Sequence, residues 1–347
     1  MTILGLDIGK FKSVACWYDP RTRDAAFTTV ATDPDAIRTL LSDRRPDLVA
    51  FETCTVAGWV ADICSELGLA YQVANPMDEA WRWSRVKRKT DRDDALKLAR
   101  MAALGQLPTV HVPSPEVRQY RGLVAYRARL VGRRTAVQNR LRALAQAHGL
   151  LLPRGHRAWT REGLAALRAI GRPPESCEPG QIWRAEFAIE CDGLEPLLNQ
   201  IGRVEQPLDA AGQSDPRVRL LETIPGVGRR TAEVIAVYLD DPKRFRTAGE
   251  VSAYAGLVPK QFQSGETDRL GRITKRGPRL LRKALVEAAW VMQRYNPWAA
   301  RTFERLSRGQ RGRRKTALVG VARKLLVRSW AMLRTEEPWR GEEVAAA

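Results

Sequence analysis

The sequence is poor in the residues that build most metal and disulfide sites. Its five cysteines are scattered without a C-x-x-C pair, and its three histidines show no H-x-x-H or H-E-x-x-H spacing. Scattered cysteines argue against a disulfide framework or a structural zinc site, and for a reducing compartment. We therefore expect a cytoplasmic protein without a histidine metal centre.

Long apolar runs are also missing. No segment reaches the ~18 consecutive apolar residues that a membrane span requires. The first residues, MTILGLDIGKFKSV, carry Asp7 early and lack the basic stretch and long apolar run of a signal peptide. We expect neither a membrane segment nor a signal peptide. The 347 residues suffice for roughly two or three domains.

Acidic residues fall well short of basic ones. Lys and Arg total 58 against 39 Asp and Glu, which gives a formal net charge of +19. Such an excess attracts polyanions through long-range steering and the release of counterions from phosphates. A genome rich in G and C would explain a preference for arginine over lysine, but not the imbalance itself. Nucleic acid is therefore the expected partner.

Residues 1 to about 108 alternate between short apolar runs and amphipathic stretches. The runs TILGLDIG, SVACWYD, AFTTVA, DLVAFE and AYQVANP predict strands, and residues 35–41, 57–67 and 91–103 predict helices. Strands followed by strand–helix alternation indicate an α/β layer fold.

From Pro115 to Gly149 the pattern predicts one long helix with coiled-coil-like spacing. Apolar residues recur every seven positions at Leu123, Leu130, Val137 and Leu144. Arg127 and Arg134 interrupt this seam, and residues 117–149 hold eight arginines and no acid. A solvated helix normally mixes charges of both signs. We interpret Arg127 and Arg134 as nucleic-acid contacts, and a plain dimerising helix remains the alternative.

The rest of the second half reads as mostly helical. Residues 153–180 are rich in Pro, Gly and Arg and predict a linker or an irregular insertion. Residues 181–208 predict a second helix that pairs with the first as an antiparallel arm.

The stretch TIPGVGRRT, within Leu220–Leu239, predicts a helix-hairpin-helix. Gly226 and Gly228 allow a tight turn whose N–H groups face a phosphate at the start of the next helix, and Arg229 and Arg230 add charge there. Such a contact positions nucleic acid without reading its sequence. A glycine-rich helical corner is the alternative.

Four acids are candidates for metal chemistry. Asp7 and Glu52 lie at the ends of predicted strands, and Asp91 and Asp94 share one face of a predicted helix. Asp93 points away from that face, and we expect it to be replaceable. Convergent carboxylates suit two Mg²⁺ ions that stabilise a phosphodiester exchange. As alternatives, Asp91 and Asp94 would cap a helix, or the D-I-G would belong to a sugar-kinase-like ATPase.

Two basic groups accompany these candidates. Lys87, Arg88 and Lys89 precede the acid cluster and are expected to bring in the phosphate backbone. Ser264 lies in a polar loop with no nearby histidine to act as its base. The basic residues around this loop suit a phosphate cradle: Lys260, Arg269, Arg272, Lys275 and Arg276.

Taken in order along the chain, these residues resemble a known family. Asp7, Glu52, KTDRDDALKLA, the arginine-rich helix, TIPGVG and YAGLVPKQFQSGETDRLGRITKRGPRLLRKALVEAA are similar to the insertion sequence 110 family of transposases. These are DEDD recombinases guided by a bridge RNA. The resemblance covers nearly the whole chain, and residues 153–180 are the least typical.

The resemblance implies three domains. These are a RuvC-like, ribonuclease H-like domain over 1–110, a helical coiled-coil arm over 111–212, and a mostly α-helical transposase domain with helix-hairpin-helix and serine loop over 213–340. By the same resemblance, Asp7, Glu52, Asp91 and Asp94 hold Mg²⁺, two ions per site, and Ser264 attacks a DNA phosphate and becomes covalently attached.

The resemblance also implies partners. The acids of one subunit would work with the serine of another, in a dimer or in a tetramer on DNA. Donor and target DNA and a structured guide RNA encoded by the element would be bound, and the protein would associate with the nucleoid when it acts.

The residues themselves leave rival functions open. A metal-dependent nuclease or junction resolvase would use the acids with water and would not need Ser264. A sugar-kinase-like ATPase would need a second glycine-rich phosphate motif, which the second half does not show. A non-catalytic nucleic-acid-binding protein would use the acids only as helix caps.

Overall fold

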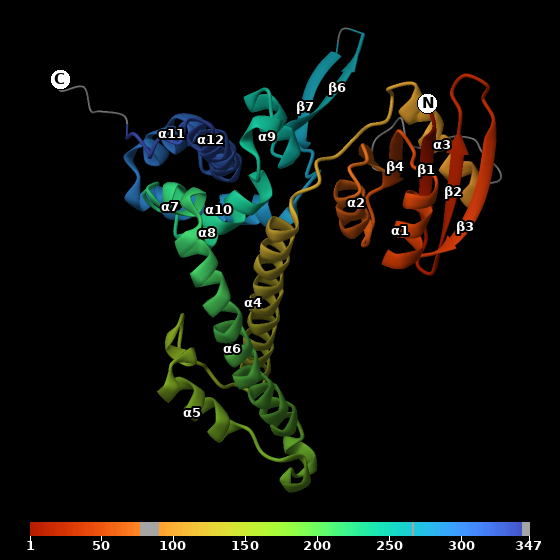
Figure 1. Ribbon diagram of the computed structural model, residues 1–347. Coiled ribbons are helices and arrows are strands. Elements are labelled where there is room, and N and C mark those ends of the chain that lie inside the picture. The colour runs from red at the N-terminus through yellow and green to blue at the C-terminus, as the bar shows by residue number, and fades with distance from the viewer. Residues whose placement is uncertain (77–89, 266, 342–347) are drawn as a thin grey trace, which may run out of the picture. The chain divides into compact units, whose positions relative to one another are not determined.

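The chain forms two compact units, Met1–Arg118 and Gln119–Ala347, and the computed structural model describes residues 1–76, 90–265 and 267–341 (Figure 1). The first unit is built on a mixed sheet with strand order β3-β2-β1-β4-β5. The strands are β1 (Ile3–Ile8), β2 (Lys12–Tyr18), β3 (Ala25–Ala31), β4 (Leu48–Glu52) and β5 (Tyr71–Ala74). β2 is antiparallel to β1 and β3, whereas β4 is parallel to β1 and β5.

Helices cover both faces of this sheet. They are α1 (Pro34–Asp43), α2 (Ala57–Glu66) and α3 (Asp91–Ala103). Leu4, Leu6 and Phe51 share a core with α1 and α2, whereas Ile3 and Ala50 share a core with α3. Successive side chains of a strand point to opposite faces. The odd-numbered residues of β1 and the even-numbered residues of β4 therefore face α3.

The expected elements of residues 1–108 are all present, and most bounds agree within two residues. The prediction of an α/β layer is confirmed. The mixed sheet with helices on both faces is compatible with a RuvC-like domain.

Two long helices, α4 (Pro115–Ala147) and α6 (Trp183–Ser214), lie side by side in the second unit (Figure 1). Leu130 of α4 packs against Leu197 and Ile201 of α6, and Arg127 pairs with Glu205 further along. The helices run antiparallel, as predicted, and α6 continues through two internal prolines. We call α4 and α6 the arm; its coiled-coil geometry stays a prediction.

The segment 153–180 is more regular than predicted. It contains η2 (Arg157–Trp159), α5 (Arg161–Ile170), η3 (Pro174–Ser176) and η4 (Pro179–Gln181). Leu167 of α5 is fully buried and packs in one cluster with Leu141 and Phe187 of the arm. The prediction of a linker or irregular insertion is therefore wrong for α5, whose apolar face supplies the burial that a solvated linker lacks.

Helices make up most of the C-terminal part. They are α7 (Pro216–Glu222), α8 (Arg229–Leu239), η5 (Pro242–Arg244), α9 (Ala248–Tyr254), α10 (Arg279–Tyr295), α11 (Pro297–Ser307), η6 (Arg311–Arg313) and α12 (Arg314–Thr335). Ile235, Leu285 and Leu325 are fully buried where α8, α10 and α12 share one core. In the described parts of the chain, no helix is long and apolar enough to cross a membrane.

A two-stranded hairpin interrupts these helices. It consists of β6 (Pro259–Ser264) and β7 (Thr267–Ile273), which run antiparallel where the sequence predicted a polar loop. Nearly all of its described residues are exposed. Backbone pairing forms this hairpin without a buried apolar face, so the alternation that normally predicts a strand is missing.

Candidate active site and nucleic-acid contacts

Two predicted metal ligands lie at the ends of neighbouring parallel strands. Asp7 lies near the end of β1, and Glu52 is the last residue of β4. The register pairs Leu6 with Phe51, so Asp7 and Glu52 follow at adjacent positions. Both are half-buried and belong to the set of residues that faces α3. The sheet thus brings these carboxylates to the same edge and the same face.

Helix α3 packs so closely on β1 that no side chain would fit at Gly5. A methyl group placed on Gly5 of β1 would come within 2.0 Å of the Ala95 carbonyl oxygen and 2.9 Å of the Ala99 nitrogen. Asp94, next to Ala95, is only 6% exposed, on the side of the sheet that Asp7 shares. A glycine inside a strand marks close backbone approach. The first glycine of GLDIG is the sequence signal for this contact, and the predictions from sequence missed it.

The first turn of α3 gives its acids different roles. The Asp93 N–H donates to Thr90 Oγ1 at 3.3 Å, and the Thr90 N–H donates to the Asp93 carboxylate at 3.1 Å. This capping box satisfies two donors at the helix start. The side-chain cap considered for Asp91 and Asp94 is thus filled by Thr90 and Asp93, although both acids remain in the first turn. Asp93, which we expected to be replaceable, has a structural role.

The acids offer the oxygen donors that Mg²⁺ prefers. Within residues 1–76, 90–265 and 267–341, however, no three Asp, Glu, His or Cys side chains lie close enough together to hold a metal ion as they stand. The donor type and the shared face fit a divalent ion, and binding would require the carboxylates to converge further. Lys87, Arg88 and Lys89 lie outside the described residues.

Ser264 stands at the tip of the hairpin. It ends β6 opposite Thr267, and Gly265 opens the turn with a left-handed φ of +54°. Glycine at the first turn position is typical of two-residue hairpins. Ser264 is exposed. The hydroxyl belongs to the second unit, whereas the four acids belong to the first.

The five basic residues predicted around this serine are all exposed: Lys260, Arg269, Arg272, Lys275 and Arg276. The Arg269 guanidinium lies 5.7 Å from the centre of the Phe262 ring across the hairpin. Arg282 of α10 donates to the carbonyl oxygens of Arg276 and Gly277, at 2.8 and 3.0 Å. The loop after β7 is thereby fixed to α10, with its cations toward solvent.

The two glycines between α7 and α8 have different roles. Gly226 has a φ of +91°, and a methyl group there would lie 2.9 Å from the Cα of Met292, so the turn packs closely on α10. Gly228 precedes α8 and is exposed, and within the described residues no atom beyond its own chain neighbours lies within 4 Å of where its Cβ would be. An open helix N-terminus of this kind suits an anion. The helix-hairpin-helix assignment stays a prediction.

Arg229 and Arg230 are occupied by carboxylates. Arg230 donates to Glu233 at 2.8 Å and to Asp209 of α6 at 2.6 Å, and Arg229 donates to Glu222 at 3.3 Å. Burial raises the pKa of the Glu233 carboxyl, although Arg230 opposes the shift. A phosphate contact at either arginine stays a prediction, and a phosphate would compete with these pairs.

The arginines of the arm face acids rather than only solvent. Arg127 Nη2 lies 2.6 Å from the Glu205 carboxylate, and Arg140 pairs with Glu186. Arg134 is half-buried, and its Nε has no hydrogen-bond partner among the described residues. The facing helix α6 carries six acids: Glu186, Glu190, Asp192, Glu195, Glu205 and Asp209. Two of them serve other helices, since Glu195 pairs with Arg168 of α5 and Asp209 with Arg230 of α8. The interpretation of Arg127 and Arg134 as phosphate contacts took no account of the acids on this facing helix and stays an untested prediction.

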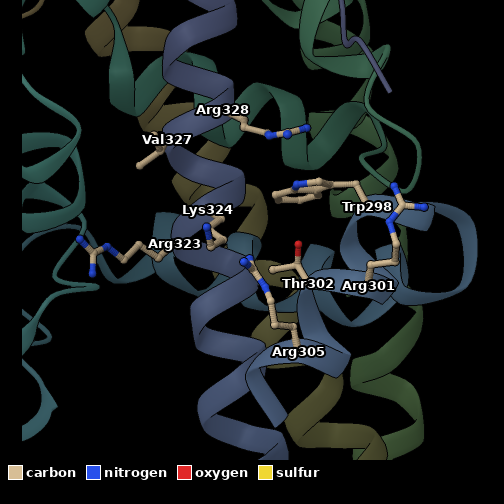
Figure 2. A pocket seen from close by; sticks show the side chains of 8 residues that line it. All are labelled: Trp298, Arg301, Thr302, Arg305, Arg323, Lys324, Val327 and Arg328. Carbon is tan, nitrogen blue, oxygen red and sulfur yellow. The ribbon is translucent and has the colours of Figure 1, made fainter. Parts of the chain in front are cut away.

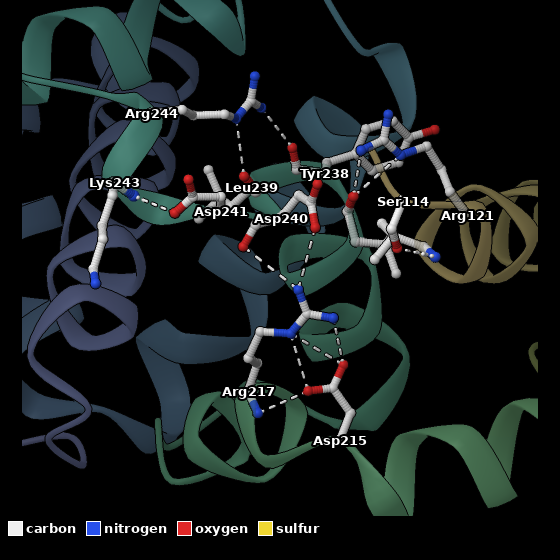
Figure 3. Close-up of polar contacts among 12 residues, drawn as sticks. Ser114, Arg121, Asp215, Arg217, Tyr238, Leu239, Asp240, Asp241, Lys243 and Arg244 are labelled. Carbon is white, nitrogen blue, oxygen red and sulfur yellow. Dashed lines mark hydrogen bonds and ion pairs between the residues drawn. The ribbon is translucent and has the colours of Figure 1, made fainter. Parts of the chain in front are cut away.

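Further arginines satisfy the end of helix α8 (Figure 3). Arg121 of α4 donates to the Val237 carbonyl at 2.6 Å, and Arg244 donates to the carbonyls of Tyr238 and Leu239 at 3.0 and 3.1 Å. The last carbonyls of a helix have no intrahelical partner and carry partial negative charge. Part of the positive charge therefore stabilises the fold.

Two family models match the chain. Residues 4–148 match the model of IS110-type DEDD transposases, described as "Transposase", and residues 218–305 match the model described as "Transposase IS116/IS110/IS902 family". The first match contains the sheet, α3 and α4. The second contains the hairpin of Ser264 and the glycine turn.

Several relatives match the chain, two of them over most of their length. A Pseudomonas aeruginosa protein described as "Probable family 20 transposase" is 31% identical, covering 88% of this chain and 89% of the relative. The "Transposase for insertion sequence element IS1111A" of Coxiella burnetii is 29% identical over 97% and 91%. The "Pilin gene-inverting protein" of Moraxella lacunata is 31% identical over 43% and 45%. The chain belongs to the IS110 family of transposases.

Proposed function

We propose that the protein is an RNA-guided recombinase that moves its own insertion element, joining donor and target DNA through a serine–phosphate intermediate. The observation that carries the proposal is the arrangement of the acids. Asp7 and Glu52 end adjacent strands on the face that α3 covers, where Asp94 is buried. Ser264 stands exposed on a separate hairpin as a candidate nucleophile.

The chemistry divides between these two parts. Asp7, Glu52, Asp91 and Asp94 would hold divalent ions, with Mg²⁺ suited to carboxylate oxygens and two ions suited to one site. Ions bound there supply charge that neutralises the phosphate and favours ionisation of an alcohol. These residues position the scissile phosphate on the face of the sheet that α3 covers.

The covalent steps exchange one phosphoester for another. Ser264 Oγ loses its proton to solvent and bonds to phosphorus, while the sugar oxygen leaves and takes up a proton. A hydroxyl of the incoming strand then displaces Ser264, which regains a proton. One P–O bond forms and one breaks in each step, so rejoining the strands needs no external energy source.

The serine test uses a matched control on the same hairpin. Ser264→Ala is expected to abolish both the covalent protein–DNA adduct and strand exchange, whereas Thr267→Ala removes the hydroxyl of its strand partner and leaves both intact. If Ser264→Ala cleaves and rejoins DNA as the wild type does, the metal-dependent nuclease or resolvase, which uses water, is the better function.

The acids and the serine are proposed to come from different subunits of a dimer, or of a tetramer on DNA. Their location in separate units of the chain supports this arrangement. Asp7→Ala and Ser264→Ala subunits, co-expressed with different tags and purified as the mixed dimer, should recover strand exchange through the one intact composite site. Inactivity of a folded mixed dimer would place both groups in the same subunit.

The guide RNA is the partner that the resemblance implies, and the net charge of +19 supports a polyanion. Sequencing of the RNA that co-purifies with the protein should yield a structured transcript encoded beside the gene. RNA-free protein with undiminished DNA activity would contradict RNA guidance while leaving the serine chemistry in place.

A further inference from the structure

A groove of about 770 Å³ lies between α11 and α12, outside the site described above (Figure 2). Its lining is dominated by cations: Trp298, Arg301, Thr302, Arg305, Arg323, Lys324, Val327 and Arg328. Five of these eight residues are basic and none is acidic. A lining of this composition suits an anion and offers little to an apolar ligand.

The spacing of the cations concentrates the charge. Arg301 and Arg305 are four residues apart on α11, and Lys324 and Arg328 are four residues apart on α12. Like charges at this spacing destabilise a helix by roughly 0.2–0.5 kcal/mol per pair. Figure 2 shows Arg305 and Lys324 approaching each other across the groove. An anion bound between Arg305 and Lys324 would relieve the repulsion between these two cations.

The surrounding contacts hold part of this cluster in place. The Arg328 guanidinium lies against two indole rings that contact each other, 4.4 Å from the centre of Trp298 and 4.8 Å from that of Trp339. Arg323 points away from the other cations in Figure 2, and its Nε donates to Ser252 of α9 at 3.2 Å. Arg305 and Lys324 are both exposed. These two are the side chains best placed to reach a ligand.

We infer that this groove binds the phosphodiester backbone of a nucleic acid, with Arg305 and Lys324 each contacting a phosphate. The inference rests on the nucleic-acid binding in the proposed function and not on its serine chemistry. Trp298 is only 6% exposed, so its ring is not offered to a base. Contacts to phosphates alone position the strand without reading its sequence.

The test measures how affinity depends on salt. Removing one phosphate contact lowers the slope of log K against log salt by about 0.9 on duplex DNA and about 0.7 on a single strand. Arg305→Gln/Lys324→Gln should therefore lower the slope by about 1.8 on duplex DNA, or by about 1.4 on single-stranded RNA, whichever occupies the groove. Arg161→Gln/Arg172→Gln removes the same charge from two positions near α5, outside the groove, and should leave both slopes nearly unchanged.

The outcomes separate this inference from the proposed function. If the groove variant and the control variant give the same slopes on both nucleic acids, the groove is not a phosphate site, even though the wild type binds. If the wild type binds neither nucleic acid, the inference and the proposed function fail together. Should the double variant not fold, Lys324→Gln alone is expected to give half the change in slope.

Discussion

The arm and the α11–α12 groove both contain several arginines, but they differ in how many acids stand opposite these arginines. In the arm, α4 carries eight arginines and the neighbouring α6 carries six acids, and two of these arginines, Arg127 and Arg140, form ion pairs with α6. In the groove, α12 carries six basic residues and no acid, and α11 carries one acid, Glu304. The facing helix, rather than the arginine count of one helix, decides whether the charge stabilises the fold or remains available to a ligand.

The largest effect is expected where the arm meets α8. Glu233 is 1% exposed and accepts from Arg230, which also pairs with Asp209. Glu233→Ala leaves the guanidinium without its most buried acceptor and should lower the free energy of unfolding by about 2–3 kcal/mol, measured by urea denaturation.

Glu233→Gln is the matched control for this change. Burial raises the pKa of the Glu233 carboxyl. The folded state therefore favours the neutral form, and stability linked to this group is present at acid pH and falls as pH rises through the folded pKa. The amide keeps a hydrogen-bond acceptor without the charge and should change the free energy of unfolding by less than about 1 kcal/mol. A loss equal to that of the alanine variant would mean that charge, and not the acceptor, stabilises the junction.

Two substitutions inside the arm should have effects of opposite sign. Arg127→Leu removes a half-buried ion pair with Glu205 and should cost about 1 kcal/mol. Arg134→Leu removes a buried Nε that has no partner among the described residues, and should stabilise by about 1 kcal/mol. The same variants test the predicted phosphate contacts: a reduced salt slope of RNA or DNA binding would support these contacts, and wild-type slopes in both variants would exclude them.

The smallest effect is expected in the groove without a ligand. Arg305→Gln/Lys324→Gln relieves repulsion between like charges and should raise the free energy of unfolding by about 0.5 kcal/mol in low salt. Screening should remove most of that gain at high salt, on the order of 0.5 M NaCl, because both side chains are exposed. A variant less stable than the wild type at low salt would contradict the repulsion assigned to Arg305 and Lys324.

Secondary structure was predicted correctly from the sequence where the local pattern and the tertiary environment agree. The strands and helices around Asp7 and Glu52 followed from apolar runs, and strand alternation then places both acids on one face. Their relation to Asp94 depends on Gly5 and on the contact with Ala95, which joins residues ninety positions apart. The sequence around Gly5 signals a close backbone approach, but it does not show which helix makes that approach.

The failures share a physical origin. The hairpin of Ser264 is formed by backbone hydrogen bonds between two strands whose side chains are mostly polar. Helix α5 was not predicted because it lies in a segment rich in proline and glycine. The occupation of Arg230 and Arg127 depends on acids of α6, which lie about twenty to eighty positions away in sequence. One-dimensional patterns report the charge of a residue, whereas its availability depends on the partner that the fold provides.

The exposed tip that carries Ser264 has a consequence for the safety of the host genome. An alcohol surrounded by solvent is a weak nucleophile. On the proposed function, a newly made subunit therefore carries its reactive group in a harmless form. On that function, breakage of a chromosome would require a second subunit, metal ions and DNA to meet at the same serine, and this requirement by itself would limit random cutting.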